Sequence, residues 1–459
     1  MLTIVILAAG KGTRMKSEKP KVLLEAANKP MIDYAIDLSL DLNPNKIIVV
    51  IGNGADLVKT HVQNKYKDKN IEFALQSTQN GTADAVNSAI EFIPDDGKTL
   101  ILCGDMPLMK SSTFKNFIEK ANNNKISFIS VETKNPKGYG RIIRTSKNEV
   151  LKIVEEKDAN DYEKKINEVN TGVYLCDSVE LKNNLNNVNN NNAQNEYYLT
   201  DIVGLGAYAY KADNDTEFMG VNDRVQLSNA SKIIWKERAE KYMEEGVSII
   251  DSNTVYISDN VKISPDTLIY PNVYIESDTI INKSVTIYSG CRISKSEISE
   301  NVLIKENSLI EESYVGKDSV IGPMAHLRPG SYLEGDNKVG NFVELKKAKM
   351  GLGSKASHLT YLGDAELGSN VNIGCGTITC NYDGYNKYKT VIGNNVFIGS
   401  DTQLVAPVNI GDNALIGAGS TITKDVSKNS LSLSRTPQVN KENLGFELME
   451  RNRIKKEGK

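Results

Sequence analysis

Aliphatic residues recur at every sixth position over most of the second half of this 459-residue chain. The count begins at Ile257, restarts at Ile298 and Val315 after slips of one residue, and runs again from Ile392 to Ile422. A period of six fits neither the 3.6-residue turn of an α-helix nor the two-residue alternation of a strand. It is typical of a parallel β-helix of hexapeptide repeats, whose aliphatic side chains point into a triangular prism.

The regular count fails in two intervals, residues 346–366 and residues 374–391. We expect the prism to eject both segments, because a purely structural coil has no need to break its repeat. The chain has three histidines, and only His358 lies in a gap, whereas His61 falls in a predicted surface helix and His326 in the regular ladder. Histidine titrates near neutral pH, so His358 is the main candidate for a general base.

Bulk composition excludes several classes of protein. The net charge of −3 gives no sign of a nucleic-acid-binding or membrane-surface protein. The five cysteines are scattered and contain no CxxC, which predicts a reducing, cytoplasmic setting and argues against a structural zinc site. No apolar run reaches the length of about 18 residues that a membrane-spanning helix needs. The chain is also too long for one ordinary core, so we expect at least two domains.

The first half begins with a continuous apolar run at residues 2–7, which predicts a strand buried on both faces. The sequence AAGKGTRM follows at residues 8–15, and Pro20-Lys21 comes soon after. Small residues let successive backbone N–H groups approach an anion closely, so this loop is a candidate phosphate cradle. Together with Lys21, the motif resembles the triphosphate loop of sugar-1-phosphate nucleotidylyltransferases.

Three further apolar runs, at residues 47–51, 71–75 and 100–103, alternate with helix-length segments. This alternation predicts a Rossmann-like α/β domain with an open, mostly parallel sheet that binds ligands at the carboxyl ends of its strands. Asp105 follows the last of these runs. A carboxylate at this place is a candidate Mg²⁺ ligand, because Mg²⁺ takes carboxylate oxygens together with substrate phosphates.

Longer motifs extend the resemblance over nearly the whole chain. They are HLRPG at 326–330, NFVELKK at 341–347, NIGCGT at 372–377, NYDG at 381–384, GSDTQ at 399–403 and SRTPQ at 434–438. With the N-terminal loop, they resemble the bifunctional N-acetylglucosamine-1-phosphate uridylyltransferase/glucosamine-1-phosphate N-acetyltransferase family. The resemblance implies a left-handed β-helix, a homotrimer with acetyl-transfer sites shared between chains, and UDP-N-acetylglucosamine as the product.

The resemblance also implies which residues of the first domain bind UTP and N-acetylglucosamine-1-phosphate. These are Leu7, Ala8, Gly10, Arg14, Lys21, Gln76, Gly81, Thr82, Gly140, Glu155, Asn170 and Asn222. Among them, Lys21 would neutralise phosphate charge, and Gly140, Glu155 and Asn170 would hold the sugar. Asp105 and Asn222 would hold Mg²⁺.

In the β-helix, the resemblance implies that His358 takes the proton from the amine of glucosamine-1-phosphate. Arg328, Lys346, Tyr361 and Asn372 would bind this sugar phosphate. The residues implied for acetyl-CoA are Cys375, Asn381, Tyr382, Ser400, Ala418 and Arg435.

Three positions depart from the family pattern. Asp84 stands where family members commonly have His, Cys103 where they often have Tyr, and Cys375 where they usually have Ala. The acidic Asp84 lies in sequence beside an anion-binding segment, so it bears on nucleotide affinity and preference.

Other classes remain open at this point. A nucleotidylyltransferase with a non-catalytic β-helix, as in ADP-glucose pyrophosphorylases, predicts no His, Lys and Arg cluster at a gap in the ladder. A regulatory nucleotide-exchange protein of similar domains predicts an eroded phosphate loop. A γ-class carbonic anhydrase needs three histidine ligands, and the β-helix has two histidines.

We expect four segments. Residues 1–224 form the uridylyltransferase domain, 225–246 a linker helix, 247–440 the acetyltransferase β-helix and 441–459 a tail that is frayed or an interface arm. The Asn-rich residues 183–195 predict a solvated loop.

Overall fold

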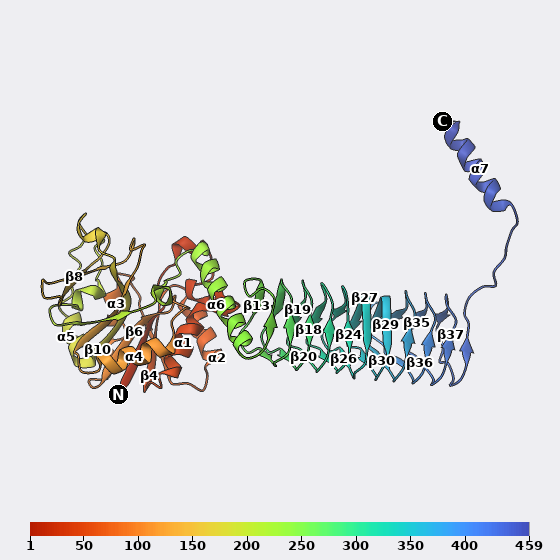
Figure 1. Cartoon of the computed structure of the whole chain (residues 1–459), viewed down its shortest axis with the longest axis horizontal. Helices are drawn as coiled ribbons and strands as arrows, with labels where there is room; N and C mark the ends of the chain where they lie inside the picture. Colours follow the sequence, from red (N-terminus) through yellow and green to blue (C-terminus); the bar gives the residue numbers. More distant parts are fainter. Residues whose placement is uncertain (459) are drawn as a thin grey trace. The chain divides into compact units, whose positions relative to one another are not determined.

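The computed structural model describes residues 1–458 and divides the chain into two compact units, Met1–Arg238 and a second that begins at Ala239 (Figure 1). The division falls within helix α6 (Arg224–Glu244), close to the predicted linker helix. Lys459, the last residue of the predicted tail, lies outside the described residues.

The first unit is built on a sheet in the order β11-β7-β10-β6-β1-β4-β5, to which β8 and β9 add a small extension. All pairs along this path are parallel except those of β10. The strands are β1 (Leu2–Leu7), β4 (Lys46–Ile51), β5 (Ile71–Leu75), β6 (Lys98–Cys103), β7 (Ile126–Glu132), β8 (Arg141–Arg144), β9 (Val150–Val154), β10 (Glu168–Asp177) and β11 (Tyr208–Ala212), with a hairpin of β2 (Glu25–Ala26) and β3 (Lys29–Pro30) outside the sheet. The four predicted strands and the mostly parallel sheet are confirmed.

Both faces of this sheet are covered. Ile4 and Ile6 of β1 belong to one hydrophobic cluster and Val5 to another, as the alternation of side chains along a strand requires. The covering helices are α1 (Met31–Asp41), α2 (Ala55–Lys65), α3 (Thr82–Asn87), α4 (Ser111–Ala121) and α5 (Ser178–Leu185). Because α5 runs through Leu185, the first three residues of the predicted Asn-rich loop are helical, and this part of the prediction is wrong.

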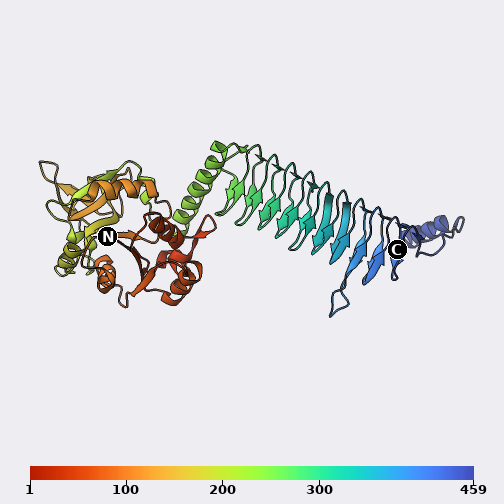
Figure 2. The same cartoon turned by 90° about the horizontal axis from the view of Figure 1, so that it is seen from below.

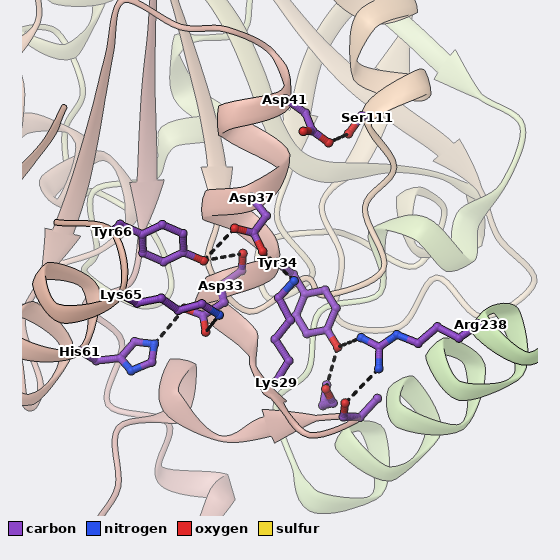
Figure 3. A network of polar contacts seen from close by, with 12 residues as sticks. Lys29, Asp33, Tyr34, Asp37, Asp41, His61, Lys65, Tyr66, Ser111 and Arg238 are labelled. Carbon is purple, nitrogen blue, oxygen red and sulfur yellow. Dashed lines mark hydrogen bonds and ion pairs between the residues drawn. The ribbon is translucent and has the colours of Figure 1, made fainter. Parts of the chain in front are cut away.

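A buried carboxylate ties α1 to α2. Asp33 is fully buried, and its two oxygens lie 2.8 Å from His61 Nε2 and 2.9 Å from Lys65 Nζ (Figure 3). His61 lies on the predicted surface helix and therefore has a structural partner, Asp33 of α1. On the other side of α1, Arg238 donates to Tyr34 Oη and to the carbonyl of Ala27.

The second unit is a parallel β-helix, and its repeat matches the count in the sequence. Strands pair in parallel with strands one coil further on, so that Ile257 is opposite Ile275 and Ile275 opposite Ile293. These isoleucines are fully buried in one continuous core. Asn and Asp occupy many of the corners with φ near +60°, for example Asn260, which suits their tolerance of the left-handed conformation.

Two of its three faces form one wrapped sheet and the third face forms another. The wrapped sheet contains β12 (Ser248–Ile249), β13 (Val255–Ile257), β15 (Leu268–Ile269), β16 (Val273–Ile275), β18 (Thr286–Ile287), β19 (Arg292–Ser294), β21 (Leu303–Ile304), β22 (Leu309–Glu311), β24 (Val320–Ile321), β25 (His326–Leu327), β27 (Lys338–Lys346), β29 (Lys355–Gly363), β31 (Asn372–Ile373), β32 (Ile378–Cys380), β34 (Phe397–Ile398), β35 (Gln403–Val405), β37 (Leu415–Ile416), β38 (Thr421–Ile422) and β39 (Leu431–Ser432). The third face contains β14 (Lys262–Ile263), β17 (Ile280–Ile281), β20 (Glu297–Ile298), β23 (Tyr314–Val315), β26 (Tyr332–Leu333), β28 (Lys349–Met350), β30 (Ala365–Leu367), β33 (Thr390–Ile392) and β36 (Val408–Ile410).

The predicted ejection of residues 346–366 is wrong. Met350, Ala356 and Leu362 are fully buried and continue the interior row across this interval. The count was lost because the row slips by one residue between Leu345 and Met350 and uses the small Ala356 as a rung. His358 and its neighbours therefore lie on regular coils, where β27 and β29 pair over most of their lengths.

The second interval is ejected only in part. The interior row continues through Ile373 and Thr379, which are buried, and resumes at Ile392. Between β32 and β33, residues 381–389 leave the prism as a projecting loop (Figure 2).

The tail is not frayed as far as residue 458, because α7 (Leu444–Glu457) is an α-helix with no buried residue. Within residues 1–458, no helix is both long and apolar enough to cross a membrane.

Candidate functional sites

The first site is a cavity of about 490 Å³ at the carboxyl ends of β1, β5 and β6. The loops after these strands supply most of its wall. Its lining consists of Leu7, Ala8, Ala9, Gly10, Lys11, Lys21, Val22, Gln76, Gln79, Gly81, Thr82, Ala85, Cys103, Asp105 and Glu196. Most of the residues implied for the nucleotide are therefore brought together, and the cavity has the size of a small-molecule site.

The glycine-rich loop and Lys21 fit closely because of Gly12. This residue has φ of +58°, and a Cβ there would lie 2.7 Å from Lys21 Cβ. Glycine is favoured on both counts, since it tolerates a positive φ and leaves room for the lysine. Gln79 Nε2 also donates to the carbonyl of Ala9 at 2.9 Å and ties the loop to the strand-end segment of β5.

Lys21 lies between the two expected metal ligands. Its Nζ pairs with Asp105 Oδ2 and donates to Asn222 Oδ1 at 2.9 Å. Asn222 reaches this position because the N–H of Val221 donates to the carbonyl of Asp105 at 3.0 Å. Asp105 and Asn222 offer two hard oxygen donors that already contact the ammonium group of Lys21. Such donors suit Mg²⁺, whose other ligands are substrate phosphates and water. Among residues 1–458, no cluster of three or more His, Cys, Asp or Glu side chains could hold a metal by itself.

The residues implied for the sugar form a separate group. Asn170 N–H donates to the carbonyl of Gly140 at 2.9 Å, and a Cβ on Gly140 would lie 3.5 Å from Glu155 Oε1. Burial raises the pKa of Glu155, and a hydrogen bond from Thr200 lowers it in part. Among the described residues, the cavity lining includes none of these three, nor Arg14 and Asn222.

Cys103, one of the three departures, lines the cavity as a neutral thiol. Burial first and the charge of Asp105 second raise the pKa of its thiol to about 12.

In the second unit, His358 is aligned by a neighbouring coil. β27 places Asn341 opposite His358 of β29, and His358 Nδ1 lies 2.9 Å from Asn341 Oδ1. An amide oxygen only accepts hydrogen bonds, so Nδ1 carries the proton and Nε2 keeps its lone pair. Asn341 begins the NFVELKK motif, but its role was missed from the sequence, although its 17-residue spacing from His358 is about one coil and could have revealed it.

The residues implied for acetyl-CoA continue the row that Asn341 and His358 begin. Backbone hydrogen bonds between coils join residues 359 to 376, 375 to 401 and 400 to 419. The members of the row, each followed by a residue with positive φ, are Asn341, His358, Cys375, Ser400 and Ala418. Arg435 Nη1 donates to the carbonyl of Ala418 at 2.6 Å, so Arg435 also lies beside this row.

A group of positive charges lies beside Tyr361. Lys387 of the projecting loop lowers the pKa of Lys346 by direct contact and by its charge, and Arg328 adds to this effect. The carboxylate of Glu344 accepts from Arg328 Nη1 at 2.7 Å and raises the pKa of the guanidinium. Asp364 and Glu311 also lie near this group, yet Lys346 and Lys387 contact each other and no ion pair of theirs is found among the described residues. Two like charges in contact suit a phosphate between them. Lys387 was missed from the sequence, where nothing marks it.

Tyr361 is folded back over a glycine. A Cβ at Gly363 would lie 2.4 Å from Tyr361 Oη, and Gly363 is opposite Lys346 in the next coil. Asn381 is buried and donates to Asp364 Oδ2 at 2.6 Å, whereas Tyr382 is exposed on the projecting loop. Asn372 lies on β31, opposite Lys355 of β29.

Comparisons with known proteins match one family to the first unit and two families to the second. Residues 3–223 match the nucleotidyl transferase family, residues 252–360 the GMPPB C-terminal domain, and residues 389–424 the bacterial transferase hexapeptide family with six repeats. The chain is 50% identical to the bifunctional protein GlmU of Syntrophotalea carbinolica, with 95% of each chain covered. It is 47% identical to the GlmU of Trichlorobacter lovleyi, over 95% of this chain and 96% of the relative.

The chain belongs to the bifunctional GlmU family. Membership confirms the resemblance drawn from the motifs, the two fold types and the prediction of a bifunctional enzyme. It removes the non-catalytic and regulatory alternatives.

Proposed function

We propose that the chain makes UDP-N-acetylglucosamine, a precursor of bacterial cell-wall polymers, by two reactions. The β-helix acetylates glucosamine-1-phosphate with acetyl-CoA, and the first unit transfers a uridylyl group from UTP to the product. We assign the reactions to residues 247–440 and 1–224, joined by 225–246, and we give the tail from 441 no role. The observation that carries the proposal is the alignment of His358 by Asn341 beside a group of phosphate-binding cations.

In acetyl transfer, the amine nitrogen attacks the thioester carbon, and Nε2 of His358 accepts the proton that leaves the nitrogen. The C–S bond then breaks, and coenzyme A leaves as a thiolate that takes up this proton. The proton on Nδ1 stays with Asn341 as acceptor, which holds the base in one tautomer. Arg328, Lys346 and Lys387 hold the sugar phosphate, and Tyr361 lies beside them. General-base assistance of this kind is worth about 10²–10⁴-fold.

In uridylyl transfer, a phosphate oxygen of N-acetylglucosamine-1-phosphate attacks the α-phosphorus of UTP, and pyrophosphate leaves. Such transfers depend on positioning and charge, so no side-chain nucleophile is needed. Asp105 and Asn222 would hold Mg²⁺, which supplies charge neutralisation at the phosphates. Lys21, which contacts both Asp105 and Asn222, would bind phosphate, and Gly140, Glu155 and Asn170 would orient the sugar.

We further propose a cytoplasmic homotrimer. His358, Ser400, Ala418 and Arg435 are all exposed on one chain, whereas acyl transfer needs a site shielded from water. A neighbouring copy against this row would supply the cover. The five cysteines are all free, which suits a reducing compartment.

The test is product formation by the purified chain. Incubation with glucosamine-1-phosphate, acetyl-CoA, UTP and Mg²⁺ should give UDP-N-acetylglucosamine by mass spectrometry. Omitting acetyl-CoA should stop it, and N-acetylglucosamine-1-phosphate should restore it. Absence of product under all conditions would refute the proposal.

A further inference from the structure

Gln76 is held in one orientation by the start of α3. Its Nε2 donates to Asp84 Oδ2 at 2.7 Å and lies 3.3 Å from the carbonyl oxygen of Gly81. Both hydrogens of the amide nitrogen therefore have acceptors. Within residues 1–458 nothing donates to Gln76 Oε1, and this atom is not among the buried polar atoms that lack a partner. Oε1 is thus the polar atom of Gln76 that remains available to a ligand.

Asp84 makes the shorter of the two contacts that fix this orientation, at 2.7 Å against 3.3 Å for the carbonyl of Gly81. A carboxylate has only acceptor atoms, so the group of Gln76 that faces it must be the amide nitrogen. The same oxygen, Oδ2, also lies 3.3 Å from the N–H of Asn80, which keeps it directed at this point. An asparagine at position 84 could offer either an oxygen or an NH₂, and only the longer contact to Gly81 would then oppose the other orientation of Gln76.

Asp84 acts on the cavity without lining it. Gln76 is 5% exposed and lines the nucleotide cavity, whereas Asp84 lines a second cavity of about 350 Å³ together with Asn80 and Tyr197. The side-chain contact that links Asp84 to the first cavity is its hydrogen bond from Gln76.

Gln76 lies away from the groups that suit phosphates. It follows β5, whereas Asp105 follows β6, and β1 and β4 lie between these two strands in the sheet. Of the cavity lining, Lys11, Lys21 and Asp105 are charged, Gln76, Thr82 and Ala85 are uncharged, and Glu196 adds a further carboxylate. A nucleotide with its phosphates near Lys21 and Asp105 places its base toward Gln76. This placement rests on the proposed uridylyl transfer.

We propose that Asp84 is a positioning residue that sets base specificity, by holding Gln76 so that its Oε1 accepts a hydrogen bond from a pyrimidine N3–H. Uracil carries a hydrogen on N3, whereas cytosine presents a lone pair there. The fixed Oε1 therefore favours uracil. It disfavours cytosine, because its lone pair would face the lone pair on N3. Thymine also has the N3–H, so Asp84 does not distinguish UTP from dTTP.

The test compares nucleotides in Asp84→Asn. The UTP:CTP ratio of kcat/KM should fall about tenfold, mainly through a higher KM for UTP, because Gln76 can now turn its NH₂ to N3 of cytosine. The UTP:dTTP ratio should stay unchanged. Ser88→Ala is the matched control, since Ser88 lies on the same turn and bonds only the backbone carbonyl of Asp84.

A double variant keeps the proposal testable if the single one folds poorly. In Gln76→Glu with Asp84→Asn, the carboxylate at position 76 has only acceptors, and the amide introduced at position 84 can donate to it. The preference for UTP over CTP should return. An unchanged UTP:CTP ratio in Asp84→Asn, an equal loss with both nucleotides, or no recovery in the double variant would overturn the proposal. A wild-type chain that uses no UTP would instead refute the uridylyl transfer itself.

Discussion

The two candidate sites are built in opposite ways. In the first unit, loops after parallel strands enclose a cavity, and its charged groups pair with one another, as Lys21 does with Asp105 and Asn222. In the second, the site is a row of side chains on the outside of a closed prism, and His358 is exposed. A sheet with a crevice can build an enclosed site within one chain, whereas a prism without a crevice leaves its site exposed on one chain.

The two sites also differ in what aligns their side chains. In the cavity, long-range contacts between loops fix the side chains, so that Asp105 and Asn222 meet although they lie far apart in the sequence. On the prism, the register of neighbouring coils is enough, and Asn341 meets His358 because β27 and β29 pair at that position. A variant at one of the two sites should therefore leave the other site unchanged.

The largest effect is expected for Lys21→Met. It removes a charge that contacts both Asp105 and Asn222, and it would lower kcat/KM for uridylyl transfer about 10²–10³-fold, as loss of an aimed donor does. Acetyl transfer measured on the same sample should not change. Loss of both activities would mean that the variant disturbs the chain as a whole.

A smaller effect is expected for Asn341→Ala. Without its acceptor, His358 can place its proton on either nitrogen, and acetyl transfer should fall about tenfold in kcat while uridylyl transfer is kept. Asn341→Asp supplies an acceptor again and should recover part of the rate. An alanine variant with wild-type kcat would show that Asn341 does not align the base.

Lys387→Ala should act mainly on substrate binding. It removes one of three cations around the expected phosphate position, so KM for glucosamine-1-phosphate should rise a few-fold with little change in kcat. Lys389→Ala is the control, since Lys389 follows on the same loop and pairs with Glu366. A similar KM change in both variants would indicate a general effect of loop charge.

The smallest effect concerns stability and Glu155. Its folded pKa is raised, so the folded state binds more protons than the unfolded state between the unfolded pKa and the folded pKa. Stability is therefore lost as pH rises through this window. Glu155→Gln should remove that loss, so that its Tm relative to wild type increases between about pH 4 and neutral pH. A constant Tm difference across this range would contradict the assignment.

Much of the fold could be predicted, because its signals are local and periodic. The isoleucine count indicated the prism, and the apolar runs indicated β1, β4, β5 and β6. The count failed between Leu345 and Leu367 because two slips of one residue, before Met350 and before Leu367, and one alanine rung hide the regular coils.

The sites were predicted less completely, for a physical reason. Motifs mark residues such as His358 and Lys346, but the roles of their partners Asn341 and Lys387 follow only from which coils and loops lie together. The effect of having Asp at position 84, where the family commonly has His, likewise depends on a contact with Gln76 that the sequence does not show.

The central claim is that two independent sites perform the two reactions, and one paired measurement tests it most directly. Asp105→Ala and His358→Ala are each assayed for both half-reactions. The account predicts that Asp105→Ala loses uridylyl transfer and keeps acetyl transfer, and that His358→Ala does the reverse. Loss of both activities in either variant would contradict it.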